Sequence, residues 1–112
     1  MSALLTDLSP RPASFASRRQ RVLELRARIR ELAARHGASA ISVFGSVARG
    51  EDAPQSDIDF LVKFPAGATL QGVVELAESL EQLLGCKVDL VSEHAGLKPR
   101  FLEAIKDELL SL

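Results

Sequence analysis

This sequence lacks several features that would indicate a single-stranded nucleic-acid-binding protein, an exported protein or a membrane protein. It has no tryptophan and no tyrosine, so aromatic stacking platforms for single-stranded nucleic acid are scarce. Its single cysteine, Cys86, cannot form an internal disulfide, which fits a reducing compartment. No apolar stretch approaches the ~18 residues of a membrane span, and the first residues lack the long apolar segment of a signal peptide. We therefore expect a cytoplasmic protein that does not bind membranes.

The charge balance is close to neutral. With a net charge of −1, no overall electrostatic field draws the chain to nucleic acid or to anionic lipid. Direct nucleic-acid binding is therefore not expected, although the net charge does not exclude a local basic patch. Hydrophobic residues make up 46% of the chain and charged residues 26%, which is ordinary for a globular protein. A length of 112 residues allows one domain with a modest core.

The domain boundary lies near the N-terminus. Residues 1–17 show no clear period, and Ser9-Pro10-Arg11-Pro12 breaks any helix. We expect a flexible arm there, with an extension that grips a partner as the sharper alternative. Residues 18–112 are predicted to form a single domain.

Hydrophobic periodicity predicts the order αβαβαβα in that domain. We expect helices over 18–36 and 69–84 and from 98 onward, a short helix within 45–50, and strands over 38–44, 56–64 and 87–91. The second long helix should turn one apolar stripe inward, made of Leu70, Val73, Val74, Ala77, Leu80 and Leu84. This order predicts an α/β (α+β) fold, with a small mixed sheet flanked by helices.

Two acidic residues in the second strand need an explanation, because acids are depleted in strands. Asp57 and Asp59 are two positions apart, so both carboxylates should point to one face while Ile58 points to the core. Carboxylates this close repel unless a cation lies between them, and their hard oxygens favour Mg²⁺ or Mn²⁺. The plainer interpretation is an exposed acidic pair at the end of a strand. Asp89, between two apolar residues of the next strand, is the third candidate ligand.

Gly45-Ser46 ends an apolar run and opens a tight turn. Such a turn offers backbone N–H groups and a hydroxyl to a phosphate oxygen, although a plain turn and helix cap would look the same. Arg49 could neutralise phosphate or simply be solvated, and the two interpretations are about equal. The lysine-containing loop of Walker-type ATPases is absent, which argues against an ATPase.

These residues carry a resemblance to a known family. Gly45-Ser46, followed after ten residues by Asp57-Ile58-Asp59, resembles the Gly-Ser…Asp-x-Asp signature of the polymerase-β-like nucleotidyltransferases. The fuller pattern from Gly45 to Val62 is similar to the minimal nucleotidyltransferase (MNT) branch. Members of that branch are commonly antitoxins paired with HEPN-domain toxins. The likeness runs from about Arg18 to the C-terminus.

The resemblance implies a function and a role for each site residue. It implies an enzyme that uses ATP and two Mg²⁺ ions to place AMP on a tyrosine of a cognate HEPN ribonuclease toxin. Asp57, Asp59 and Asp89 would ligate metal, and Asp89 would also receive the proton of the attacking hydroxyl. Gly45 and Ser46 would grip the β- and γ-phosphates. The short chain favours a protein acceptor, because antibiotic-modifying relatives carry an additional domain.

Two other functions remain open at the level of sequence. The chain could be a non-catalytic antitoxin that masks its partner by forming a complex, with an incidental carboxylate site. It could also be a nucleotidyltransferase that acts on a small molecule or an RNA end. The complete Gly-Ser…Asp-x-Asp set counts against the first of these.

Overall fold

The computed structural model describes residues 17–51, 53, 56–93 and 99–112. The predicted arm over residues 1–17 lies outside this part of the chain, except for Ser17. Ser17 is the N-cap of the first described helix, and its hydroxyl accepts a hydrogen bond from the Gln20 backbone N–H at 3.0 Å. The part of the chain that the structure describes therefore opens with a capped helix.

The described elements follow the predicted order and add a short C-terminal segment. The helices are α3 (Arg18–Glu24), α4 (Arg26–Arg35), α5 (Gly45–Arg49), α6 (Leu70–Leu84) and α7 (Pro99–Ile105). The strands are β1 (Ala40–Phe44), β2 (Ile58–Lys63), β3 (Val88–Glu93) and β4 (Leu110–Ser111), and the 3₁₀ helix η1 (Lys106–Glu108) precedes β4. Within the described residues, no helix is both long and apolar enough to cross a membrane.

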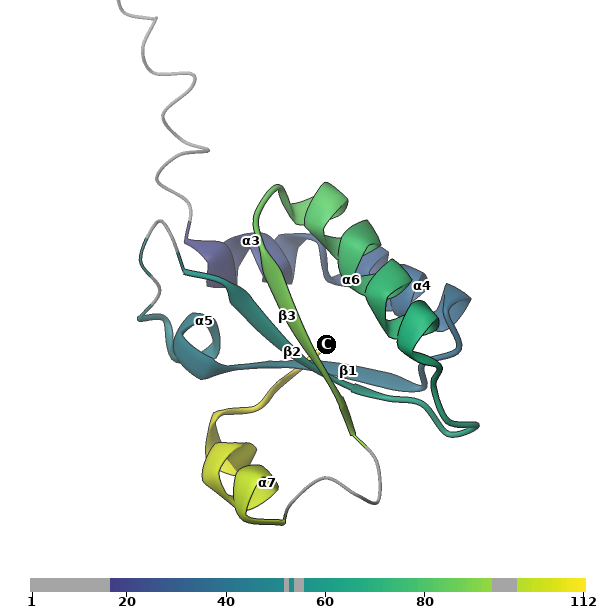
Figure 1. The fold of residues 1–112 in the computed structure, drawn as a ribbon. Helices are drawn as coiled ribbons and strands as arrows, with labels where there is room; N and C mark the ends of the chain where they lie inside the picture. The colour runs from purple at the N-terminus through teal and green to yellow at the C-terminus, as the bar shows by residue number, and fades with distance from the viewer. Residues whose placement is uncertain (1–16, 52, 54–55, 94–98) are drawn as a thin grey trace, which may run out of the picture.

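The four strands form one mixed sheet in the order β3-β2-β1-β4 (Figure 1). β1 pairs antiparallel with β2 and with β4, whereas β2 and β3 run parallel. The parallel pair needs a crossover, and α6 supplies it. The predicted α/β fold with a small mixed sheet is confirmed.

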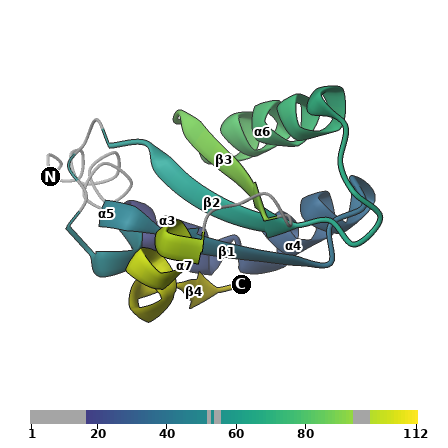
Figure 2. The same cartoon turned by 60° about the horizontal axis from the view of Figure 1, so that its bottom comes forward.

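One face of the sheet carries the core. Figures 1 and 2 show α4 and α6 together on this face, while α7 lies on the opposite side of the sheet. The strand residues that point toward α4 and α6 are apolar and almost fully buried: Ile41, Val43, Ile58, Phe60, Val62 and Val88. Since strand residues alternate between faces, the residues between them point toward the side of α7. That second face holds the candidate site.

The first predicted helix is two helices. Residues 18–36 were expected to form one helix, but Leu25, with φ −99° and ψ 13°, leaves the helical conformation between α3 and α4. The Leu25 N–H still bonds to Arg21, and the Leu25 carbonyl still accepts from Ile29. The chain therefore bends without losing its apolar stripe, and Val22 and Ile29 are both fully buried. No proline or glycine marks this bend in the sequence.

The predicted inward stripe of α6 is wrong at its N-terminal end. Leu70 is 80% exposed and Val74 is 46% exposed, whereas Leu76, which the prediction left out, is fully buried. The buried stripe consists of Leu76, Leu80 and Leu84. Thr69 caps the N-terminus of α6: its hydroxyl accepts a hydrogen bond from the Gly72 N–H at 2.9 Å.

Candidate active site

Asp59 lies at the centre of the second face of the sheet. Its neighbours Ile58 and Phe60 are fully buried on the core side, so the Asp59 carboxylate points to the other side. Its register partners are Phe44 on β1 and Asp89 on β3. Paired residues of neighbouring strands share a face, with strands about 4.8 Å apart. The prediction that Asp59 and Asp89 lie side by side is thus met by the strand register.

Asp57 lies in the loop just before β2, close enough to Asp59 to affect its pKa. It was predicted to lie within the strand, but β2 begins one residue later, at Ile58, whose N–H bonds to the Lys87 carbonyl at 3.1 Å. The preceding turn is closed by Ser56, whose hydroxyl accepts from the Ala53 N–H at 2.7 Å, as expected of a turn residue. Asp57 is half-buried. It is therefore held by a turn and by the first pairing of the sheet.

The carboxylates interact electrostatically. The pKa of Asp59 is raised above its usual value, first because partial burial disfavours the charged form, and then because Asp89 and Asp57 place negative charge nearby. Glu108 adds to this repulsion, and Arg49 opposes it. The site is therefore short of positive charge, which is the condition that a divalent cation would relieve.

Gly45 is required by Asp59. Its φ of +77° is in the left-handed region, where side chains are strained. A Cβ at this position would also overlap the Asp59 carboxylate far inside contact distance. The glycine therefore lets the start of α5 lie directly on the carboxylate. Sequence reasoning assigned Gly45 to phosphate binding and did not foresee this contact with Asp59.

Ser46 occupies the first turn of α5. Phe44 is the N-cap residue of this five-residue helix, and no side chain caps it. Ser46 is half-buried, and its carbonyl accepts a hydrogen bond from the Glu51 N–H at 2.8 Å. Gly50, with φ +74°, ends the helix as its C-cap. The predicted turn and short helix over residues 45–50 are thus present, and Ser46 lies one residue from the glycine that abuts Asp59.

Arg49 lies between two carboxylates. Its Nε donates to Glu51 at 2.9 Å, and its Nη1 donates to Glu108 of η1. The hydrogen bonds to Glu51 and then to Glu108 raise the pKa of Arg49 above its usual value. Sequence reasoning did not find Glu108, because the pair joins residues 59 positions apart and no local pattern links them.

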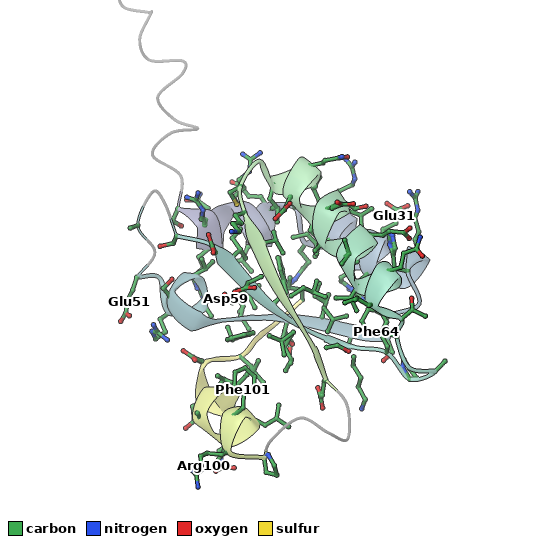
Figure 3. All side chains as sticks on the ribbon, in the orientation of Figure 1. Glu31, Glu51, Asp59, Phe64, Arg100 and Phe101 are labelled. Atoms are coloured by element: carbon green, nitrogen blue, oxygen red, sulfur yellow. The ribbon has the colours of Figure 1, made fainter. Side chains whose placement is uncertain are left out.

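α7 covers part of the same face. Phe44, the register partner of Asp59, meets Phe101 of α7 edge to face, with ring centroids 5.6 Å apart. Figure 3 shows Asp59 and Phe101 on the same side of the sheet, with Arg100 at the far side of α7.

The described residues contain no group of three His, Cys, Asp or Glu side chains already close enough to hold a metal ion. The chemistry of the three aspartates nevertheless suits a hard divalent cation, because all their donors are carboxylate oxygens and Asp59 lacks compensating charge. Two cavities of about 620 and 450 Å³ lie elsewhere, one between α4 and the β1–β4 edge, and one between α5 and the C-terminal segment. Neither is lined by the aspartates.

Comparison with known proteins identifies the family. Residues 24–112 match the nucleotidyltransferase domain family. The chain is 42% identical over 86 residues to the protein adenylyltransferase MntA of Thermococcus cleftensis, a match that covers 77% of this chain and 86% of that protein.

Two solved structures extend the likeness. A structure described as a minimal nucleotidyltransferase is 48% identical, with a TM-score of 0.68 over 81% of this chain and 95% of that chain. A toxin–antitoxin structure with AMP-PNP is 31% identical, with a TM-score of 0.54 over 59% of this chain and 55% of that chain. The chain therefore belongs to the nucleotidyltransferase domain family, and within it to the minimal nucleotidyltransferases, as the sequence signature predicted.

Proposed function

We propose that this nucleotidyltransferase is a Mg²⁺-dependent antitoxin that transfers AMP from ATP to a tyrosine hydroxyl of a cognate HEPN ribonuclease toxin. The observation that carries the proposal is the register of Asp59 with Asp89, on the face where Gly45 abuts the Asp59 carboxylate. This brings the two halves of the sequence signature into direct contact. The raised pKa of Asp59 supports it, since cations are the natural partners of such a cluster.

Each aspartate has a role in this proposal. Asp57 and Asp59 hold divalent cations, and Asp89 completes the set on the neighbouring strand. Mg²⁺ ions bound there would lower the pKa of the acceptor hydroxyl and neutralise the leaving pyrophosphate. As the tyrosine hydroxyl oxygen attacks the α-phosphorus, Asp89 receives the proton of that hydroxyl. A new P–O bond to the tyrosine forms, the bond from the α-phosphorus to the bridging oxygen breaks, and pyrophosphate leaves.

Gly45, Ser46 and Arg49 bind the phosphates in this proposal. Because Gly45 has no Cβ, the start of α5 lies directly against the Asp59 carboxylate, so phosphates held by α5 would lie next to the aspartates. Ser46 supplies a hydroxyl in the same turn, and Arg49 supplies a guanidinium at the other end of α5. The triphosphate would therefore lie along α5, with its α-phosphorus toward the aspartates.

The proposed partner and nucleotide are supported by what related proteins bind. The relative from Thermococcus cleftensis is named a protein adenylyltransferase, which supports a protein acceptor. A neighbour 31% identical to this chain is a toxin–antitoxin assembly with AMP-PNP, which supports a toxin partner and ATP. The HEPN class of the toxin and the tyrosine acceptor follow from the resemblance to MNT antitoxins.

Mass spectrometry of the cognate toxin tests the proposal. After incubation with this protein, ATP and Mg²⁺, we expect the toxin to gain one or more AMP groups on tyrosine, and the Asp57→Asn, Asp59→Asn double variant to add none. An unmodified toxin that is still neutralised by the double variant would contradict the proposal and support masking by complex formation. Transfer to RNA ends instead of the toxin would contradict the acceptor.

A further inference from the structure

Glu108 lies far from the sequence signature but contacts one of its residues. It belongs to η1, follows α7, and its side chain is only 19% exposed. Its carboxylate accepts a hydrogen bond from Arg49 Nη1, across 59 positions of sequence. The contact joins the C-terminal segment to the end of α5.

Arg49 is fixed from two sides. Nε donates to Glu51 and Nη1 to Glu108, so the two carboxylates hold different edges of the guanidinium plane. An arginine has five N–H donors in a rigid planar fork, and Nη2 takes part in neither contact. Two anchors on separate nitrogens define the direction of the plane, which one anchor would not.

The backbone beneath Arg49 is also supported. Arg19 of α3 donates from Nε to the Ala48 carbonyl at 3.2 Å, and Gly50 ends α5 immediately afterwards. A cavity of about 450 Å³ opens beside the ion pair, with Arg19, Arg49, Asp107 and Glu108 among its lining residues. Arg49 therefore lies at an opening and is not enclosed by packing.

We propose that Glu108 is a positioning residue for the candidate site: together with Glu51, it holds the Arg49 guanidinium in the orientation that receives the nucleotide's phosphates. The inference rests on the proposed function. A long arginine side chain gives up rotamer freedom when it binds a ligand, and a side chain oriented in advance gives up less. Removing the Glu108 charge should therefore weaken nucleotide binding.

The opposite expectation follows from charge alone. A carboxylate beside a triphosphate site repels the phosphates, so a Glu108 that merely competes for Arg49 would weaken nucleotide binding, and its removal would tighten it. The direction of the effect therefore separates positioning from competition.

Calorimetric titration of AMP-PNP with Mg²⁺ into the Glu108→Gln variant tests the inference. The amide keeps the shape of the side chain, and we expect the Kd to rise roughly three- to tenfold, the range of a single oriented ion pair. Glu103→Gln is the matched control, because Glu103 is 71% exposed, pairs with Lys106 and is not a partner of Arg49 in these ion pairs. The Kd of AMP-PNP for this control variant should stay within about twofold of the Kd for the original protein.

A double-mutant cycle shows whether Glu108 acts through Arg49. In an Arg49→Lys background, which cannot hold both carboxylates with a planar fork, Glu108→Gln should change the Kd by less than about twofold. With the toxin as acceptor, Glu108→Gln should raise the KM for ATP more than it lowers kcat. A merely structural role would lower thermal stability without this dependence on Arg49.

The outcomes separate the two proposals. If the unsubstituted protein binds no AMP-PNP with Mg²⁺, the proposed function fails and this inference falls with it. If it binds but Glu108→Gln tightens binding, leaves it unchanged, or acts equally in the Arg49→Lys background, the inference alone is overturned. Should Glu108→Gln fail to fold, Glu108→Asp keeps the charge but shortens its reach, and a smaller rise in Kd is expected from it.

Discussion

The two faces of the sheet are built from the same strands, but the face toward α7 carries Asp59 and Asp89 beside the apolar Leu61, whereas β2 presents only apolar side chains to the other face. On the face toward α4 and α6, Ile58, Phe60 and Val62 of β2 are fully buried among apolar neighbours. On the face toward α7, Asp59 is only half-buried, and its register partner is another aspartate. The face toward α4 and α6 contributes to the stability of the fold. The face toward α7 keeps like charges close together, which lowers that stability. That division is expected of a site that function maintains.

The largest effect should come from removing a charge on the second face. Asp59→Asn should lower AMP transfer to the toxin by about a thousandfold or more, because the proposed function makes Asp59 the central metal ligand. The measurement is the rate of toxin modification by mass spectrometry at saturating ATP and Mg²⁺. Glu75→Gln, on the exposed side of α6, is the control and should leave the rate unchanged. An Asp59→Asn variant within tenfold of the original rate would refute the assignment.

The core face should respond in stability instead. Phe60→Ala removes a fully buried ring and should lower the free energy of unfolding by about 3–5 kcal/mol. Val74→Ala is the matched change at a side chain that is 46% exposed, and it should shift stability by less than about 0.5 kcal/mol. Urea unfolding checks both. Equal losses from the two variants would contradict the observed burial of α6 and β2.

Gly45 lies in the turn after β1, where its backbone contacts the Asp59 carboxylate of β2. Gly45→Ala should destabilise the protein by roughly 2 kcal/mol, since it adds a clash with Asp59 to the strain of a positive φ. Gly85→Ala has a similar φ of +72° with no atom within 4 Å of its Cβ, so it should cost only about 1 kcal/mol. Thermal unfolding compares them, and the difference should shrink in an Asp59→Ala background. An undiminished difference would show that the clash is not with Asp59.

The smallest effect is a pH dependence of stability. Because the pKa of Asp59 is raised in the folded protein, the folded state holds the proton more tightly than the unfolded state, and ionised Asp59 opposes folding at neutral pH. Without divalent cations, Asp59→Asn should therefore raise Tm by roughly 1–4 °C at pH 7. The gain should fade as the pH drops through the raised pKa, and it should vanish well below the usual aspartate pKa of about 3.9, where aspartate is protonated in both states. A gain that grows on acidification would contradict this sign.

Sequence reasoning predicted the element order and the paired aspartates because both depend on local patterns. Period-2 alternation in β2 predicted the face of Asp59. Asp89, between two apolar residues of the next strand, was a third candidate whose role in the site was implied by the family resemblance. It missed the bend at Leu25, since no proline or glycine marks it. It also misjudged Leu70 and Val74, because an apolar stripe on a helix does not say where the sheet beneath it ends.

The partners of Arg49 were beyond local reasoning for another reason. Glu51 is two residues away, but Glu108 reaches Arg49 only because α7 folds back across the second face and η1 follows it. The two-residue strand β4, which pairs with β1, was likewise missed, because so short an element has no detectable period. Long-range contacts of this kind depend on the whole topology and not on any spacing in the chain.

Binding of Mn²⁺, a spectroscopic substitute for Mg²⁺, tests most directly whether the second face is a cation site. Electron paramagnetic resonance can count the Mn²⁺ ions bound by the protein with AMP-PNP, before and after Asp59→Asn. We predict about two ions per molecule with micromolar affinity in the original protein, and a loss of binding of at least tenfold in the variant. Equal Mn²⁺ binding by both proteins would contradict a cation site formed by the aspartates of β2 and β3.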